Sequence, residues 1–375
     1  MRTIILKPSH RCNLNCWFCY DRFNRSKNAA VLPVDKCIYG LKKILSEWNA
    51  MGEQGYEIIW HGGEPMLLGV DYVRQVCEAI NDEYDISWKM QSNVALMNEE
   101  WKKLAQDYNM HIGASWDGIQ VDTKDSHNNT YLLNAEQYMP HQMSALYVIT
   151  PDNAKYIFDN YLYAKERGWN VAFNIVFGVP VTNEQYFEMA TYLILLLDYI
   201  CSVPDAFVPR PFLEDFNYIN GNLSVLCESS ICAGRWIGMD SNGDITACGK
   251  PWPDSVVWGN IFDENFHIYD LPKNVHFQKF KDNILKQWEH CRDCKYLFQC
   301  SNACPFSSTG PDGEIHFNEG YCYFKKTYMD MMLRLLNEKY ENRTLYNKEI
   351  LQYLQQSQKM EFVKWKTYKY PTTEI

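Results

Sequence analysis

TIILKPSHRCNLNCWFC, residues 3–19, is a short apolar run followed by three closely spaced cysteines. The run Thr3–Lys7 is rich in β-branched residues and ends at a proline, which is typical of a buried strand. The cysteines stand at positions 12, 16 and 19, in the loop that follows this strand. Thiolates gathered at such a spacing indicate metal ligation or catalysis at the carboxyl end of the first strand.

Strand-like and helix-like segments alternate after this loop. Further strands are predicted at Glu57–His61, Ser87–Gln91, His111–Ser115, Ala145–Thr150 and Val171–Phe177. Apolar residues recur at helical spacing in Val34–Asn49, Tyr72–Asp85, Asn98–Asp107, Ala154–Arg167 and Glu184–Cys201, whereas the connection after Asp117 is poorly helical. Alternation of this kind favours a parallel sheet with right-handed crossovers. Six units predict an α/β fold, a partial (β/α)6 TIM-like barrel with its functional residues at the carboxyl ends of the strands.

The pattern changes near Pro204. Prolines and short loops replace the alternation, and eight of the fourteen cysteines fall between Cys227 and Cys322. Many cysteines with little periodic structure indicate a second domain organised by metal. Segments 323–340 and 348–365 have helical patterns. We therefore expect a barrel in residues 1–203, a cysteine-rich domain in 204–340 and a helical C-terminal tail in 341–375.

Composition and charge limit the partners. The formal net charge is −10 and no lysine or arginine run stands out, so a nucleic-acid partner is not expected. The N-terminus lacks the apolar core of a signal peptide, and the apolar stretch Tyr192–Val203 is too short to span a membrane. We expect a cytoplasmic protein with no membrane partner. Thiols stay reduced there, so its cysteines are not expected to form disulfides.

The N-terminal cysteines follow the pattern C-x3-C-x2-C, with Phe18 before the third. Three thiolates can hold three irons of a four-iron, four-sulfur cubane and leave the fourth iron open. A zinc site would need a fourth ligand, for which His10 is the nearby candidate. The loop resembles the signature of the radical S-adenosylmethionine (SAM) superfamily. The resemblance implies that SAM binds the open iron and yields a 5′-deoxyadenosyl radical, which abstracts hydrogen from a C–H bond.

The next strand is followed by Trp60-His61-Gly62-Gly63-Glu64-Pro65. Glycines allow close backbone approach, and a carboxylate accepts charge-assisted hydrogen bonds from an ammonium group. The resemblance assigns four residues to SAM binding, namely Phe18, Gly62, Gly63 and Glu64. It adds Ser92, Asn93, Ser115 and Asp117 at the following strand ends, where a role as helix cap or turn former is the alternative. The arginine that the family often carries soon after Asp117 is missing, and Lys124 is the nearest cation.

The later cysteines resemble a SPASM domain, the auxiliary-cluster domain of several radical SAM maturases. Seven match its pattern in order and spacing, and Cys227 stands at the place of an eighth. The resemblance implies a first auxiliary four-iron cluster on Cys227, Cys232, Cys248 and Cys304. It implies a second on Cys291, Cys294, Cys300 and Cys322. Two zinc sites of four thiolates are the alternative. Cys37, Cys77 and Cys201 are expected to be buried apolar residues.

The substrate is less defined. Enzymes with SPASM domains most often modify a peptide or protein side chain by cross-linking, oxidation, epimerisation or excision. No recognition domain precedes Cys12, so peptide modification would need a separate peptide-recognition protein or a very short recognition segment. A reductant such as flavodoxin or ferredoxin is also expected. Oxidation or rearrangement of a small molecule such as an aminoglycoside is the second hypothesis. A zinc-binding, non-enzymatic module is the third.

Three residues at the barrel mouth are candidates to meet the substrate. Similar sulfatase maturases carry a catalytic aspartate directly after the cysteine that Cys248 matches, and Gly249 stands there in this chain. This difference argues against formylglycine formation. We expect the catalytic groups among Asp21, His61 and Lys250, with a structural role as the alternative for the lone histidine.

Overall fold

The computed structural model describes residues 1–22, 30–121, 126–139, 141–219, 235–300 and 303–356. Six parallel strands form its first part: β1 (Arg2–Leu6), β2 (Tyr56–Trp60), β3 (Ile86–Ser92), β4 (His111–Trp116), β5 (Ser144–Ile149) and β6 (Asn170–Ile175). Each strand pairs with the next in chain order. Side chains alternate between buried and less buried along β3 to β6, as the two faces of a strand require. The predicted α/β barrel is confirmed, and its strands lie within a residue or two of the expected positions.

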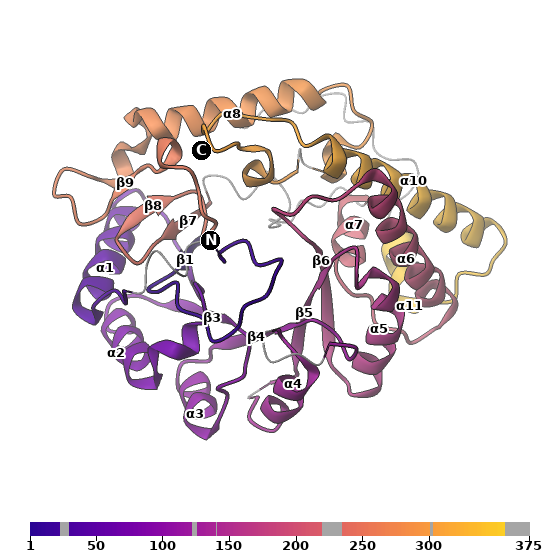
Figure 1. Cartoon of the computed structure of the whole chain (residues 1–375), viewed down its shortest axis with the longest axis horizontal. Coiled ribbons are helices and arrows are strands. Elements are labelled where there is room, and N and C mark those ends of the chain that lie inside the picture. The colour runs from indigo at the N-terminus through magenta and orange to yellow at the C-terminus, as the bar shows by residue number, and fades with distance from the viewer. Residues whose placement is uncertain (23–29, 122–125, 140, 220–234, 301–302, 357–375) are drawn as a thin grey trace.

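Helices cover the outer face of this curved sheet (Figure 1). They are α1 (Val34–Ala50), α2 (Val70–Asn81), α3 (Glu99–Asp107), α4 (Asn129–Glu136), α5 (Ile157–Glu166) and α6 (Asn183–Ser202), with short 3-10 turns at Pro65–Leu68 and Ala154–Tyr156. The connection after Asp117, predicted to be poorly helical, contains α4. This helix has eight residues, and its cap is Asn128, whose side chain accepts a hydrogen bond from the Tyr131 N–H. A short helix with a weak apolar face gives little sequence signal.

The sheet does not end with the barrel strands. β7 (Trp236–Met239) pairs in parallel with β1, so Thr3 lies beside Trp236 and Leu6 beside Met239. β8 (Asp244–Thr246) and β9 (Gly259–Asn260) then add antiparallel strands. The sheet order is β6-β5-β4-β3-β2-β1-β7-β8-β9. The carboxyl ends of β1 and β7 therefore meet at one edge, which brings the C-terminal half to the cysteine loop.

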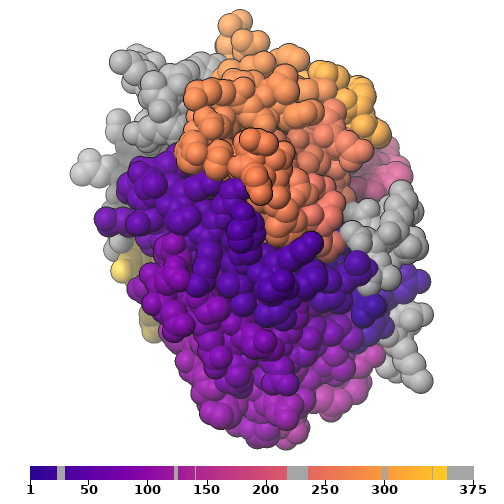
Figure 2. Space-filling view, turned by 90° about the vertical axis from the view of Figure 1, so that its left-hand side faces the viewer, coloured from indigo at the N-terminus to yellow at the C-terminus, as the bar shows by residue number. Residues whose placement is uncertain are grey.

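Helices of the second half pack along the barrel. They are α7 (Phe212–Ile219), α8 (Val275–Cys291), α9 (Leu297–Cys300), α10 (Glu319–Glu341) and α11 (Lys348–Gln356), with 3-10 turns at Asp254–Val256, Ile268–Lys273 and Pro305–Ser308. α10 lies along α6 at one side of the barrel. Residues 357–365 of the last predicted helix lie outside the described residues. Figure 2 shows the orange residues of the second half of the chain packed on the indigo and purple barrel.

Aromatic rings pack together within a largely aliphatic core. Trp60 and Trp88 stack with ring centres 6.0 Å apart, and Trp116 meets Tyr147 edge-on at 6.0 Å. All four side chains are almost fully buried. Core packing thus accounts for much of the chain's tryptophan. In the described part of the chain, no helix is long and apolar enough to cross a membrane.

Candidate radical SAM site

The cysteine loop crosses the open side of the barrel directly after β1 (Figure 1). Two backbone hydrogen bonds fold it into consecutive turns: the Cys19 N–H donates to the Cys16 carbonyl at 3.2 Å, and the Arg22 N–H donates to the Cys19 carbonyl at 3.2 Å. The Leu14 N–H points at the Cys12 sulfur, 3.4 Å away. Cys16 is buried and the other two are partly exposed. Three thiols on one tightly turned segment suit a single metal group with an open position.

Gly62 and Gly63 lie against the backbone of this loop. The Gly63 N–H donates to the Ser9 carbonyl at 3.0 Å, and the Glu64 N–H donates to the Arg11 carbonyl at 2.6 Å. A Cβ on Gly63 would stand 1.9 Å from the Arg11 oxygen, and one on Gly62 would stand 2.4 Å from the Ser9 oxygen. Gly62 also has a φ of +124°, which favours glycine. The two glycines therefore fix the cysteine loop to the end of β2.

Glu64 joins the ends of β2 and β3. Its carboxylate is buried and accepts hydrogen bonds from Ser92 Oγ at 2.7 Å, the Asn93 N–H at 2.7 Å and the Met66 N–H at 2.9 Å. Burial raises the pKa of Glu64, and these three donors partly offset the effect. Asn93 Nδ2 also donates to Asn13 Oδ1 in the cysteine loop at 2.7 Å. Glu64, Ser92 and Asn93, predicted separately, thus form one connected group beside the loop.

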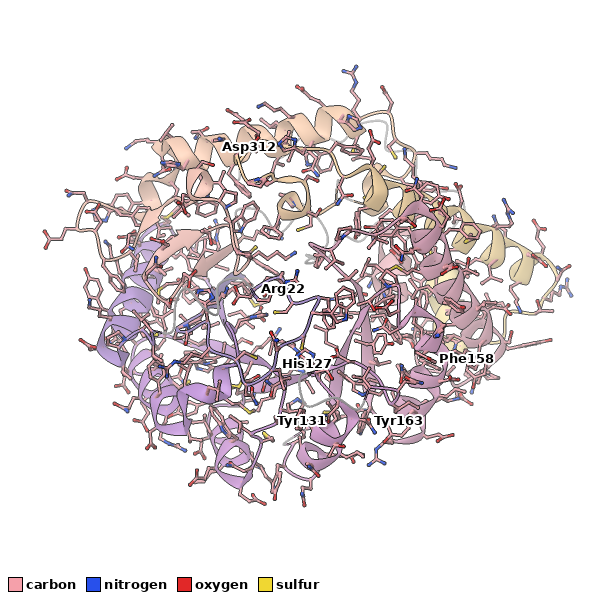
Figure 3. The ribbon with its side chains drawn as sticks, viewed as in Figure 1. Arg22, His127, Tyr131, Phe158, Tyr163 and Asp312 are labelled. Carbon is pink, nitrogen blue, oxygen red and sulfur yellow. The ribbon has the colours of Figure 1, made fainter. Side chains whose placement is uncertain are left out.

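The carboxylate of Asp117 contacts His127, a residue that was not predicted from the sequence. Its carboxylate accepts hydrogen bonds from the His127 backbone N–H at 2.9 Å and from its ring Nδ1 at 3.1 Å. The His127 ring reaches Cys16, with Nδ1 3.7 Å from Sγ, and Figure 3 shows it inside the ring of strands. Burial lowers the pKa of His127, but its hydrogen bonds with Asp117 and Cys16 raise it to about 10. A lone histidine on a loop has no spacing signal that would have identified it.

Two other predicted SAM residues lie nearby. Ser115, at the end of β4, accepts a hydrogen bond from Gln91 Nε2 at 2.9 Å. The ring of Phe18 lies 6.5 Å from that of His127. Lys124, the cation nearest to Asp117 in the sequence, lies outside the described residues. The seven predicted polar and glycine positions lie at or just after the carboxyl ends of β2, β3 and β4, as a barrel enzyme requires. They are Gly62, Gly63, Glu64, Ser92, Asn93, Ser115 and Asp117.

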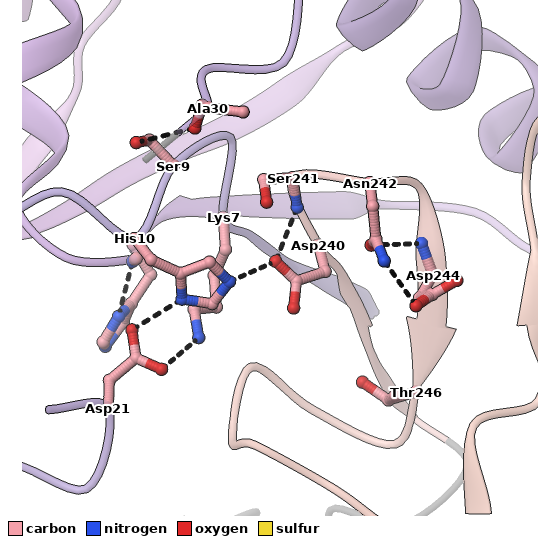
Figure 4. A network of polar contacts seen from close by, with 12 residues as sticks. Lys7, Ser9, His10, Asp21, Ala30, Asp240, Ser241, Asn242, Asp244 and Thr246 are labelled. Carbon is pink, nitrogen blue, oxygen red and sulfur yellow. Dashed lines mark hydrogen bonds and ion pairs between the residues drawn. The ribbon is translucent and has the colours of Figure 1, made fainter. Parts of the chain in front are cut away.

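Asp21 lies in a buried charged network (Figure 4). It is 1% exposed, and its carboxylate oxygens accept hydrogen bonds from Lys7 Nζ at 3.1 Å and from His10 Nδ1 at 2.8 Å. His10 Nε2 meets Asp240 Oδ1 at 2.7 Å. Burial lowers the pKa of His10, but the hydrogen bonds with the two aspartates raise it to about 9. Both ring nitrogens of His10 are engaged, so it is not the fourth ligand that a zinc site in the cysteine loop would need.

His61 is held in its neutral form. Burial and the nearby charge of Lys7 lower its pKa to about 4. The Gly62 N–H donates to His61 Nδ1 at 2.9 Å, so the neutral ring carries its proton on Nε2. The ring lies 6.4 Å from that of Tyr20. A neutral imidazole at a strand end next to the glycine segment can accept or pass on a proton at neutral pH.

A pocket of about 300 Å³ lies beside this network, where β7 and β8 meet the cysteine loop. Its lining includes Lys7, His10, Asp240, Cys248, Gly249 and Lys250. A Cβ on Gly249 would stand 2.4 Å from Ile5 Cγ2 and 3.2 Å from Lys7 Cδ. A side chain at this position would therefore have to displace the Ile5 side chain.

Cys248 and Cys304 come together although 56 positions separate them in the sequence. Burial raises the pKa of Cys248, to which the nearby Cys304 also contributes. Each sulfur accepts a hydrogen bond: Lys250 Nζ donates to Cys304 Sγ at 3.3 Å, and Trp252 Nε1 donates to Cys248 Sγ at 3.3 Å. Cys227 and Cys232, the other two predicted ligands of this group, lie outside the described residues. The two described thiols fit one shared metal group.

Four further cysteines line a second, narrow pocket: Cys291, Cys294, Cys300 and Cys322. Burial and the neighbouring thiols raise the pKa of Cys291 to about 12, and burial raises that of Cys300 to about 11. Without metal the thiols of Cys291 and Cys300 hold their protons at neutral pH, whereas a cationic iron or zinc core would displace these protons. The donor set fits the predicted second auxiliary cluster.

The remaining Cys37, Cys77 and Cys201 are each 0% exposed and lie in the apolar core, as predicted.

Comparison with known proteins agrees with this geometry. The sequence profile of the radical SAM superfamily matches residues 6–193. A cysteine-type anaerobic sulfatase-maturating enzyme of Clostridium novyi is 22% identical over 370 residues, covering 86% of this chain and 94% of the relative. A serine-type enzyme of Bacteroides thetaiotaomicron is 24% identical, covering 89% and 92%. The solved structure "Native anSMEcpe with bound AdoMet and Cp18Cys peptide" superposes with a TM-score of 0.75 at 20% identity, covering 90% and 99%. The likeness extends over both halves of the chain.

Proposed function

Since the chain belongs to the radical SAM superfamily, we propose that this enzyme abstracts hydrogen from a side chain of a peptide or protein. The proposal is supported by likeness along nearly the whole chain to enzymes named for maturing sulfatases. One observation carries the radical chemistry: Gly63 and Glu64 donate hydrogen bonds to the backbone of the loop that bears the cysteine triad, and Gly62 packs against the same backbone. The triad would bind the cluster and the glycine segment would bind SAM, so the contact between the two segments would bring the cluster and SAM together.

We assign the cofactor positions as follows. Cys12, Cys16 and Cys19 would hold the catalytic cluster, and Glu64, Ser92 and Asn93 with the glycine backbone would bind the methionine end of SAM. When bound, the cluster and SAM supply a carbon-centred radical that can take hydrogen from a C–H bond. The chain's own part is orientation. Glu64 is held by three donors before any ligand arrives, which lowers the entropy lost on binding an ammonium group.

We propose two auxiliary clusters for the cysteine-rich half, residues 204–340. The second would be held by the four cysteines of the narrow pocket, and the first by Cys248 and Cys304 together with Cys227 and Cys232. The shared pocket and the raised thiol pKa values support the second set. A reductant such as flavodoxin or ferredoxin and a peptide-recognition protein remain predictions.

The modification is proposed to differ from formylglycine formation. Gly249 stands where the sulfatase-maturase resemblance places a catalytic aspartate, and Ile5 fills the space that a side chain there would need. His61 is the better candidate for proton transfer, because it is neutral, lies directly before the glycine segment and carries its proton on Nε2. Both carboxylate oxygens of Asp21 already accept hydrogen bonds, from Lys7 and His10, which makes Asp21 a weaker candidate. We therefore propose that His61, and not a carboxylate after Cys248, serves the peptide chemistry.

The radical step can be tested without knowing the substrate. Protein reconstituted with iron and sulfide without oxygen, then given dithionite and SAM, is expected to release 5′-deoxyadenosine. Cys16→Ala should release none, since the cluster loses one of its three ligands. If the triple alanine variant at positions 12, 16 and 19 kept all of its iron, the catalytic-cluster assignment would be wrong.

The substrate class needs a second experiment. A pool of synthetic peptides that together carry each residue type with a fully deuterated side chain is incubated with enzyme, SAM and dithionite. Mass spectrometry should find deuterium in 5′-deoxyadenosine. Deuterium transfer from a deuterated aminoglycoside, with none from any peptide, would contradict the peptide proposal and support the small-molecule alternative.

A further inference from the structure

We infer that Lys250 and Trp252 set the reduction potential of the first auxiliary cluster by donating N–H···S hydrogen bonds to two of its ligands, Cys304 and Cys248. The inference rests on the proposed function, which makes these cysteines cluster ligands. It concerns two residues of the segment Cys248-Gly-Lys-Pro-Trp252 that the cofactor assignment leaves without a role.

The side chain of Lys250 is buried against the sulfur of Cys304. It is 8% exposed, and its Nζ lies 3.3 Å from Cys304 Sγ. The same Nζ lies 3.7 Å from the ring centre of Phe177 and 5.4 Å from that of Phe306. Phe177 follows β6, so the lysine extends from the β8 side to the last strand of the barrel. An amine buried among rings costs desolvation free energy, which a hydrogen bond to a thiolate offsets.

Trp252 supplies the second donor. Its Nε1 lies 3.3 Å from Cys248 Sγ, and its ring packs edge-on against Phe280 at 5.4 Å and Phe306 at 5.3 Å. The Trp252 backbone N–H donates to the Lys250 carbonyl at 2.9 Å, which closes a tight turn around the intervening proline. Phe306 contacts both side chains. One turn thus directs two N–H donors at two ligands of one cluster.

The effect on the potential follows from charge. Reduction adds one electron to a cluster, and part of that negative charge resides on the thiolate sulfurs. A hydrogen bond to a sulfur stabilises the reduced state more than the oxidised state, and hydrogen bonds to sulfur are among the factors that set cluster potentials. Both donors should therefore raise the midpoint potential. A cluster with a higher potential accepts electrons more readily.

The test is a redox titration followed by electron paramagnetic resonance. It uses the full chain with Cys12, Cys16 and Cys19 changed to alanine, so that only auxiliary clusters contribute. Lys250→Met should lower the ratio of reduced to oxidised first auxiliary cluster at least tenfold at a fixed potential, about 59 mV for a one-electron couple. Trp252→Phe, which keeps the ring but lacks the N–H, should shift the potential in the same direction. Lys250→Arg keeps a donor and should restore most of the wild-type potential.

Two matched variants serve as controls. Lys279→Met removes the same charge at a partly exposed position paired with Glu314. Trp258→Phe removes an indole N–H that has no acceptor among the described residues. Neither should move the potential. If Lys250→Met and Trp252→Phe both kept the wild-type value with full iron content, or Lys279→Met shifted it equally, the inference would be wrong.

Failure of the proposed function would look different. The double variant Cys248→Ala, Cys304→Ala should lose about four irons per chain, the content of one cubane. If it lost none, these cysteines would not be cluster ligands and the proposed function would fail at this site. If the double cysteine variant lost these four irons while the Lys250 and Trp252 variants kept the wild-type potential, only the hydrogen-bond inference would be refuted.

Discussion

Gly63 shows how much of the site depends on the lack of one side chain. Its Cα faces the carbonyl of Arg11 so closely that a methyl group would overlap the oxygen. We predict that Gly63→Ala displaces the cysteine loop, lowers the iron content and abolishes 5′-deoxyadenosine release. Iron analysis and chromatography of the reaction products measure both effects.

Gly52→Ala is the control for this change. Gly52 has a φ of +82° but nothing within 4 Å of a Cβ, so its replacement costs only backbone strain of about 1–2 kcal/mol. Its iron content should equal that of the wild type. Wild-type iron and activity in Gly63→Ala would show that the glycine segment does not fix the loop.

His61 makes stability depend on pH. Its pKa is about 4 in the folded chain and near 6.5 when unfolded, so between these values the unfolded state binds the additional proton. Stability should therefore fall as the pH decreases through this window, by about 1 kcal/mol between pH 7.5 and 5.5. Replacement by glutamine removes this contribution, so the urea midpoint of His61→Gln should fall less than that of the wild type over the same range. An equal fall in both proteins would contradict the neutral assignment.

The sequence could predict those residues whose partners are close along the chain or follow a known spacing. The cysteine triad, Glu64 and Asn93 belong to this group. Asp240 does not, because it is 230 positions from its partner His10, and neither residue lies in a pattern. His127 was missed for the same reason, since only the folded chain brings it to Cys16. Contacts between distant segments are set by packing, which a single sequence does not display.

Long periodic elements were predicted well, and short ones were not. α1 and α6 have 17 and 20 residues, enough turns for their apolar faces to appear in the sequence. β7, β8 and β9 have four, three and two residues, too few for alternation to be recognised. β7 is moreover defined by its pairing with β1, far away in the sequence. The continuous sheet across the predicted boundary at residue 203 was therefore not foreseen.

The whole molecule should hold three separate groups of iron, about 12 irons per chain. We predict that the double variant Cys291→Ala, Cys300→Ala retains about eight, because only the narrow pocket loses its ligands. The double variant Cys37→Ala, Cys201→Ala removes two thiols from the apolar core and should keep the full number. Metal analysis of anaerobically purified protein measures iron and zinc together. Zinc in place of iron at the C-terminal sites would contradict the auxiliary-cluster assignment.

The position of β1 between β2 and β7 bears on how the enzyme is made. Translation produces β1 first, yet its second neighbour leaves the ribosome only after more than half of the chain has been synthesised. Until then the nascent barrel presents an apolar strand with one bare edge, the kind of surface on which chains aggregate. The cysteine loop that follows β1 therefore reaches its final surroundings only after β7 has paired with this edge.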